Sequence, residues 1–143
     1  MIAAVVLWAA QVWATSILPP ATMKDLAQVW MGGDRSHIWY SRLELDANGT
    51  GSLIIQYLPM YPPRAYRVTR ARLAEYELRL DVAPIDAEAE SIYVRGKAYP
   101  GQLELTIGGT SGLWKSQVTF EPADRIMSKI EAVNQRAKEL SGR

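Results

Sequence analysis

Four arginines stand close together in the middle of the chain, where their guanidinium groups are able to hold an anion. Arg64, Arg67, Arg70 and Arg72 fall in one short stretch that also contains Tyr66. A guanidinium binds phosphate or carboxylate through two parallel hydrogen bonds, which favours a phospholipid headgroup or an acidic partner. The alternative is a solvated strand face that nearby glutamates partly neutralise. Under the first interpretation, we expect Arg70 or Arg72 to contact the headgroup.

Aromatic side chains are the second candidate for binding chemistry. The chain has seven Tyr and five Trp but one Phe. Tyr and Trp bury apolar area while keeping a polar tip that needs a partner. Inside a barrel they would line a cavity of mixed character, as ligand pockets require, whereas ordinary core packing is the alternative. We expect Trp39, Tyr76, Tyr93 and Trp114 to line such a cavity.

No arrangement in the sequence predicts a catalytic site. Ser36, His37 and Asp34 are close along the chain, but catalytic triads are assembled in space and not by sequence proximity. The glycine-flanked serine of a nucleophile elbow is also missing. We therefore predict that the protein is not an enzyme.

Metal and cofactor sites are not predicted either. The sequence Asp46-x-Asn48-x-Thr50-Gly51 opens like a calcium loop, but Tyr57 stands where a bidentate Glu is needed. The Asn48-Gly49 pair in this stretch indicates a hairpin turn instead. With no Cys and one His, the chain lacks the ligands of a zinc site.

Length and charge limit the class of protein. The 143 residues suit one domain, and 16 basic against 15 acidic side chains give a net charge of +1. This balance argues against general nucleic-acid binding, which uses a strongly basic surface. Without cysteine the fold depends on packing and not on disulfides.

The first 18 residues, Met1 to Leu18, contain no charged side chain. Such a run has the length of a signal-peptide core and lies at the lower limit for a transmembrane helix. We expect a cleaved export signal and a secreted or periplasmic protein. A retained membrane anchor and a buried N-terminal segment are the alternatives.

Behind this segment the pattern predicts a short helix and then strands. Thr22 and Asp25 form a capping-box pattern, and we expect the helix to end at Gly32-Gly33. Alternation and turn residues then predict seven strands. They cover residues 38–46, 52–58, 65–69, 73–82, 92–98, 102–107 and 113–121, with an acidic loop at 84–90.

An amphipathic helix over residues 122–141 is predicted to follow. Its apolar residues recur at steps of four and three, and they are Ile126, Ile130, Val133, Ala137 and Leu140. We expect it to lie against the sheet or to close one mouth of a barrel. The predicted fold is all-β: an antiparallel meander forming a small barrel or strongly curved sheet, with a short N-terminal and a C-terminal helix.

This order of elements resembles the lipocalin-like (calycin) barrels. The Gly-x-Trp opening of that family reads Gln28-Val29-Trp30 here, and Lys115 or Arg125 would be the basic residue packed over the Trp. The resemblance covers residues 22–141 as one domain, and it implies binding of a small apolar ligand.

The sequence leaves two functions open. The first is an exported, non-catalytic binding protein for a small apolar or amphiphilic ligand such as a lipid. The second is a pocketless envelope or membrane-complex protein that docks a partner through its sheet or C-terminal helix.

Overall fold

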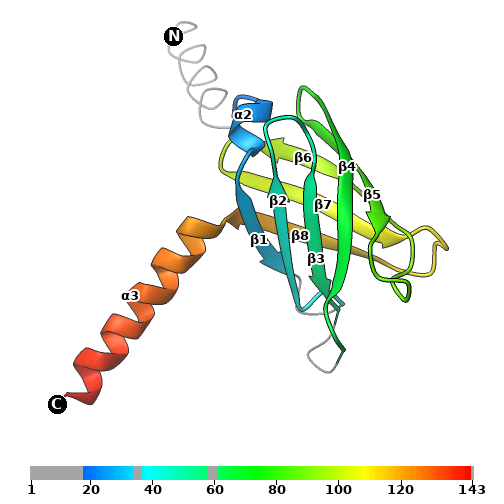
Figure 1. Ribbon diagram of the computed structural model, residues 1–143. Helices are drawn as coiled ribbons and strands as arrows, with labels where there is room; N and C mark the ends of the chain where they lie inside the picture. The colour runs from blue at the N-terminus through cyan, green and yellow to red at the C-terminus, as the bar shows by residue number, and fades with distance from the viewer. Residues whose placement is uncertain (1–17, 34–36, 58–60, 143) are drawn as a thin grey trace, which may run out of the picture.

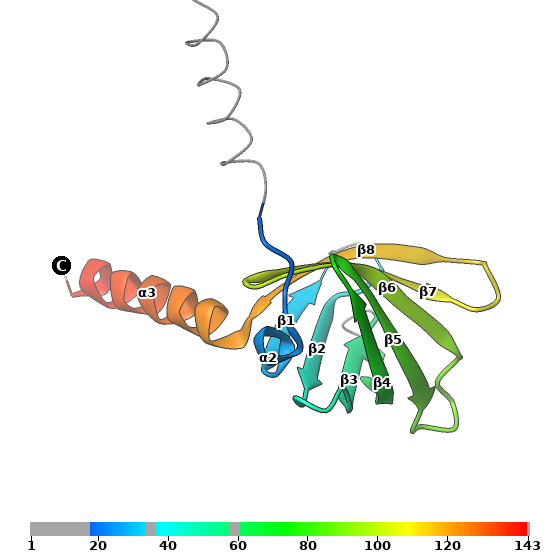
Figure 2. The same ribbon diagram turned by 90° about the horizontal axis from the view of Figure 1, so that it is seen from above.

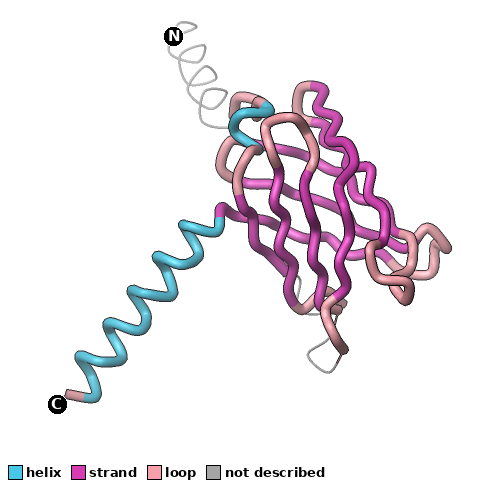
Figure 3. Tube along the Cα trace, viewed as in Figure 1, coloured by secondary structure: helices cyan, strands magenta, loops and turns pink. Residues whose placement is uncertain are grey.

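The strands form a closed antiparallel barrel in which each strand pairs with its neighbours in sequence and the first pairs with the last (Figure 1). The structure is a computed structural model that describes residues 18–33, 37–57 and 61–142. Its elements are α2 (Met23–Leu26), β1 (Val29–Gly33), β2 (Tyr40–Leu45), β3 (Gly51–Gln56), β4 (Arg64–Ala74), β5 (Glu77–Pro84), β6 (Ile92–Tyr99), β7 (Gln102–Gly109), β8 (Lys115–Pro122) and α3 (Ala123–Ser141). The predicted all-β fold class is therefore confirmed (Figure 3).

Alternation along each strand places one set of side chains inside the barrel. On β8, for example, Ser116, Val118 and Phe120 are buried while the residues between them are exposed. The largest fully buried side chains are Trp30, Tyr66, Phe120, Leu26, Ile38, Leu43, Leu53, Ile55, Leu78, Leu103, Leu105 and Ile107. Side chains therefore fill much of the interior of this small barrel, as in other eight-stranded barrels.

The prediction of seven strands and a helix reaching Gly33 is wrong, because the helix α2 ends at Leu26 and a strand follows. In β1, Trp30 pairs with Leu43 of β2 and with Pro122 of β8, and this pairing closes the barrel. Gly32 makes a close approach possible, since a Cβ there would lie 2.3 Å from the carbonyl oxygen of Thr119. Barrel closure thus overrides the predicted continuation of the helix to Gly32-Gly33.

The single strand predicted over residues 73–82 is also wrong. A hairpin turn at Glu75 and Tyr76 separates β4 from β5, and Leu73 pairs with Leu78 across it. Glu75 adopts a φ of 54°, a left-handed conformation that glycine usually supplies in such turns. Because the turn contains no Gly, Pro or Asn, the sequence carried no turn signal.

The C-terminal helix occupies almost the predicted range but not the predicted place. No side chain of α3 is buried, and the helix extends away from the barrel (Figure 2). The expectation that it lies against the sheet or closes a mouth is therefore wrong. Ile130, Val133 and Leu140 of the predicted apolar stripe are exposed.

The two ends of the barrel differ, and we name them by what they carry. At the α2 end, α2 lies beside the short turns that join β2 to β3, β4 to β5 and β6 to β7 (Figure 1). At the mouth are the connections that join β1 to β2, β3 to β4, β5 to β6 and β7 to β8.

The predicted signal or anchor over residues 1–18 lies, except for Leu18, outside the described residues. Within the described part, neither α2 nor α3 combines the length and apolarity that a membrane-spanning helix needs.

Candidate functional site

The mouth of the barrel holds a cavity of about 550 Å³. It lies between the four connections at that end, where side chains from distant parts of the chain meet. Its lining residues are His37, Tyr57, Tyr61, Pro62, Arg64, Glu88, Ala89, Glu90 and Trp114. We call this cavity the mouth pocket. Its volume lies within the range of about 300–1,000 Å³ that is common for small-molecule sites.

One wall of the mouth pocket is a cluster of three aromatic rings. The rings of His37 and Trp114 lie 4.4 Å apart with a tilt of 31°. Tyr57 stands edge-on to Trp114, with ring centroids 5.4 Å apart and planes at 88°. Edge-to-face packing of this kind favours both rings electrostatically and holds their orientation. The cluster therefore offers a pre-arranged apolar surface at an otherwise polar rim.

A pair of tyrosines connects this wall to the core. The hydroxyl oxygens of Tyr57 and Tyr66 lie 2.9 Å apart and share a hydrogen bond, while the Tyr66 side chain is fully buried. Burial is the main cause that raises the pKa of both phenols above the ordinary value of 10.0. Both groups are therefore uncharged at neutral pH and present a hydroxyl, not a phenolate, to the base of the mouth.

Charged groups also line the mouth pocket, and they come from the start of β4 and from the loop that joins β5 to β6. Arg64 at the start of β4 forms an ion pair with Glu88, with 3.1 Å between Nη1 and Oε2. The carboxylate of Asp86 accepts a hydrogen bond of 2.8 Å from the backbone N–H of Ala65, which ties the loop to β4. The mouth pocket thus combines an aromatic wall with a positive and a negative group.

Glu90 connects this loop to the aromatic cluster, because its carboxylate accepts a hydrogen bond from the indole N–H of Trp114. A glycine makes this contact possible. A Cβ on Gly109 would lie 2.7 Å from both Oε1 of Glu90 and Nε1 of Trp114. The backbone of β7 therefore passes directly behind the pair, where any larger side chain would displace one partner.

The structure brings only one of the predicted cavity aromatics into the mouth pocket, and that residue is Trp114. Trp39 is 54% exposed. Tyr93 packs its ring against Gly108 and lies below the guanidinium of Arg95. Tyr76 lies at the α2 end, where its hydroxyl donates to the carbonyl of Leu18 and its ring meets Tyr99. The expectation of one shared cavity is therefore wrong for these three.

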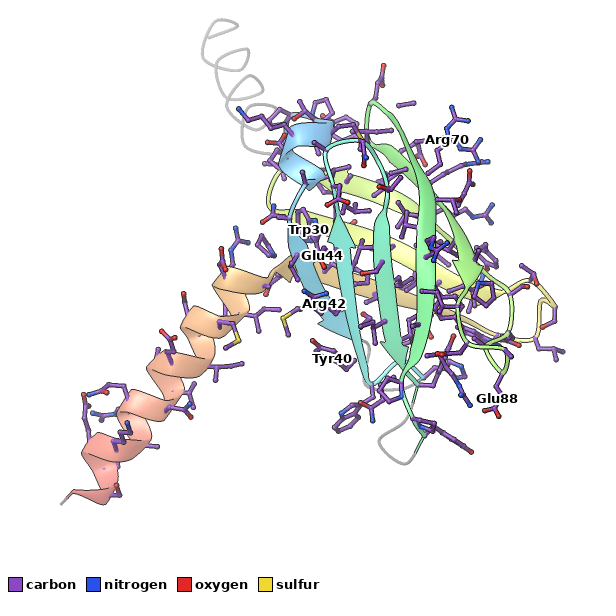
Figure 4. The ribbon with its side chains drawn as sticks, in the orientation of Figure 1. Trp30, Tyr40, Arg42, Glu44, Arg70 and Glu88 are labelled. Atoms are coloured by element: carbon purple, nitrogen blue, oxygen red, sulfur yellow. The ribbon has the colours of Figure 1, made fainter. Side chains whose placement is uncertain are left out.

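The two predicted headgroup arginines are also away from the mouth. Arg70 and Arg72 are exposed on β4, and Arg72 forms an ion pair of 2.8 Å with Asp81. Figure 4 shows Arg70 toward the α2 end and Glu88 at the mouth, at opposite ends of the barrel. Whether any of these five residues binds a ligand elsewhere remains a prediction.

Lys115 and Arg125 are the two candidates for the basic residue expected over Trp30, and the structure places them at different ends of the barrel. Lys115 begins β8 at the mouth, whereas Trp30 pairs with Pro122 at the other end of that strand. Arg125 lies at the α2 end, where it donates a hydrogen bond of 3.1 Å to the carbonyl of Gly101.

Sequence reasoning missed most of the mouth pocket, although a signal was available. His37, Arg64, Glu88 and Glu90 fall in or beside connections that alternate along the chain with the short turns. In an antiparallel meander, alternate connections meet at one end. A correct count of the strands would therefore have grouped these residues. The count failed because β1 was predicted as a helix and the turn at Glu75 was not recognised.

Two predicted absences bear on the chemistry of the site. Of the serine, histidine and aspartate considered for catalysis, only His37 is among the described residues, and its ring packs against Trp114 and Tyr57. Across the described ranges, no group of three or more His, Asp or Glu side chains is arranged to hold a metal ion.

No protein-family model, curated protein or solved structure matches this chain.

Proposed function

We propose that the protein binds a small amphiphilic ligand at the mouth pocket without chemical conversion. The observation that carries this proposal is the mouth pocket itself, a cavity of about 550 Å³ whose lining includes three aromatic rings together with Arg64, Glu88 and Glu90. Ligand sites typically combine such apolar walls with a few polar groups that fix orientation.

The ligand lies at the mouth in this proposal, not deep inside the barrel. The interior positions hold large buried side chains, among them Trp30, Tyr66 and Phe120. An apolar body would rest on Trp114 and Tyr57, and a polar group would reach Arg64 or Glu90. A relationship to lipocalin-like barrels agrees with the closed eight-stranded sheet and with the short helix before Trp30.

We extend the proposal to location: the protein works outside the cytoplasm, as a secreted or periplasmic binding protein. The uncharged run from Met1 to Leu18 supports this location. Mass spectrometry of the protein from the full-length gene tests it. A mature chain that lacks about 14–18 residues indicates a cleaved signal. An intact N-terminus indicates the anchored alternative.

A fluorescent fatty acid, titrated into the purified protein, tests the binding proposal. Trp114→Ala should weaken its binding by more than about tenfold, because it removes the ring that two others pack against. Trp39→Ala is the matched control, since Trp39 is an exposed tryptophan at the same end of the barrel. Equal affinity in the two variants, or no binding to the unaltered protein, would contradict the proposal.

A second candidate function is docking of a partner protein through α3. It is favoured by the exposed apolar stripe of that helix, on which Val133 is 68% exposed. Such a helix can lay its apolar face into a groove on another protein. In this case the mouth pocket would be incidental.

Paired glutamate substitutions on α3 test the second candidate. Val133→Glu should abolish recovery of a partner from cells, because it places a charge in the stripe. Gln135→Glu adds the same charge outside the stripe and should leave recovery unchanged. Equal recovery with both variants would exclude docking through this face.

A further inference from the structure

Three arginines from three neighbouring strands lie side by side on the outside of the barrel. In the strand register, Arg72 of β4 lies opposite Arg79 of β5, and Arg79 lies opposite Arg95 of β6. All three side chains are exposed. We call them the arginine ladder. Adjacent strands lie about 4.8 Å apart, so the ladder spans about 10 Å.

Like charges placed directly opposite one another destabilise a sheet. The local acidic residues offset this only in part. Asp81 pairs with Arg72, with 2.8 Å between Nη2 and Oδ1, and its backbone lies opposite Arg70. In the register, Arg79 lies between Arg72 and Arg95, and Arg95 lies between Arg79 and Thr106. Neither Arg79 nor Arg95 therefore has an acidic residue directly opposite it. The outer face of β4 to β6 therefore holds a surplus of positive charge.

The ladder surrounds a hollow in the surface. A cavity of about 160 Å³ is lined by Arg72, Arg79, Leu80, Asp81, Tyr93, Val94 and Arg95. The guanidinium carbon of Arg95 lies 5.1 Å from the centre of the Tyr93 ring. Stacking on an aromatic face restrains the guanidinium and reduces the entropy lost when it binds an anion.

We propose that the arginine ladder is a binding site for a phosphate group, separate from the mouth pocket. The planar guanidinium fork matches phosphate oxygens, and three forks around one hollow match a doubly charged group better than a carboxylate.

The phosphate belongs either to a small soluble molecule or to a lipid headgroup, and the chemistry of recognition is the same. The ladder lies near the turn between β4 and β5, where Tyr76 contacts Leu18. The uncharged run before Leu18 would bring the ladder near headgroups if a membrane retained it. An experiment with two arms separates the two sources.

The first arm titrates inorganic pyrophosphate into the full chain at constant ionic strength, by calorimetry. The second measures sedimentation with phosphatidylcholine vesicles, with and without phosphatidylglycerol. In whichever arm binds, Arg79→Gln should weaken binding about tenfold, because it removes the charge-assisted hydrogen bonds of the central arginine. Arg67→Gln is the matched control, an exposed arginine on β4 opposite Ala83.

Binding of pyrophosphate identifies a soluble phosphate ligand, and binding of anionic vesicles alone identifies a lipid headgroup. Equal loss in Arg79→Gln and Arg67→Gln would overturn the proposal in favour of a diffuse positive field. Absence of binding in both arms would also overturn it. Arg79→Gln should not lower the unfolding midpoint, because it relieves repulsion, and Arg95→Gln provides a second variant of the ladder.

Discussion

The two ends of the barrel are formed by the same eight strands, but different elements cover them. At the α2 end, apolar side chains and a short helix fill the opening, and the turns between strands are short. At the mouth, three of the four connections are longer than any turn at the α2 end, and aromatic and charged side chains surround a cavity. The same rigid sheet therefore supports one end that side chains seal and one end that opens on a cavity.

The seal depends on a few contacts near the start of the described chain. The side chain of Leu26 is fully buried, and its carbonyl accepts a hydrogen bond of 3.0 Å from the indole N–H of Trp30. Thr22 and Asp25 form a capping box at the start of α2, in which each side chain accepts a hydrogen bond from the backbone N–H of the other residue. These bonds fix the direction in which the chain enters the helix. At the mouth, by contrast, polar pairs such as Arg64 and Glu88 remain partly exposed.

The strongest test of this contrast is removal of the buried indole at the sealed end. Trp30→Ala should lower the free energy of unfolding by about 3–5 kcal/mol, because it leaves a large cavity where the fully buried indole was. Urea unfolding measures the change. Trp39→Ala, which truncates an exposed ring, should stay within about 0.5 kcal/mol of the unaltered protein. Similar losses in both variants would mean that the α2 end is not the stabilising end.

Alkaline pH tests the mouth. The pKa values of Tyr57 and Tyr66 are raised by burial, so both phenols stay protonated in the folded protein at a pH where the unfolded chain ionises. The unfolded state then binds fewer protons, and stability falls as pH rises above the ordinary pKa of 10.0. The loss should be on the order of 1 kcal/mol for each phenol between pH 9 and 11.

Denaturant unfolding at several pH values, together with tyrosinate absorbance, measures this loss. Tyr57→Phe should reduce the fall above pH 10 relative to the unaltered chain, since it removes one of the two groups. A fall of the same size in this variant would show that other groups cause it.

The smallest expected effect concerns the cap of α2. Thr22→Ala removes the hydroxyl that accepts from the backbone N–H of Asp25, at 3.2 Å, and should cost about 1 kcal/mol. Hydrogen exchange at the Trp30 indole should become faster, while ligand binding at the mouth stays the same. Thr119→Ala on the outer face of β8 serves as control. A loss of mouth binding with Thr22→Ala would show that the two ends are coupled.

Most of the strands could be predicted from the sequence, because each buries one face and therefore alternates. Ile92–Tyr99 and Gln102–Gly109 match the predicted strands within two residues at each end. Pro100-Gly101 separates these two strands and a run of Gly and Ser follows the second, and both are reliable turn signals. The helix Ala123–Ser141 was equally clear from its apolar stripe.

What failed depends on contacts between distant residues. Val29–Gly33 is a strand because it pairs with both β2 and β8, and nothing within that segment alone indicates this pairing. The turn at Glu75 is enforced by the register of β4 against β5, not by a turn residue.

The candidate site was harder to predict than the fold. The mouth pocket assembles residues as far apart as His37 and Trp114, and their proximity follows only from the closed order of strands. The arginine ladder shows the same limit. Arg72 belonged to the basic run noted in the sequence, but Arg79 and Arg95 join it only through the strand register.

The pairing of the first strand with the last also has a consequence for biosynthesis. A growing chain that ends before Lys115 has two unpaired sheet edges, one on β1 and one on β7. Contacts of such high sequence separation form slowly and late. The barrel therefore closes only after β8 has been made, and until then the β1 and β7 edges both lack their partner strand.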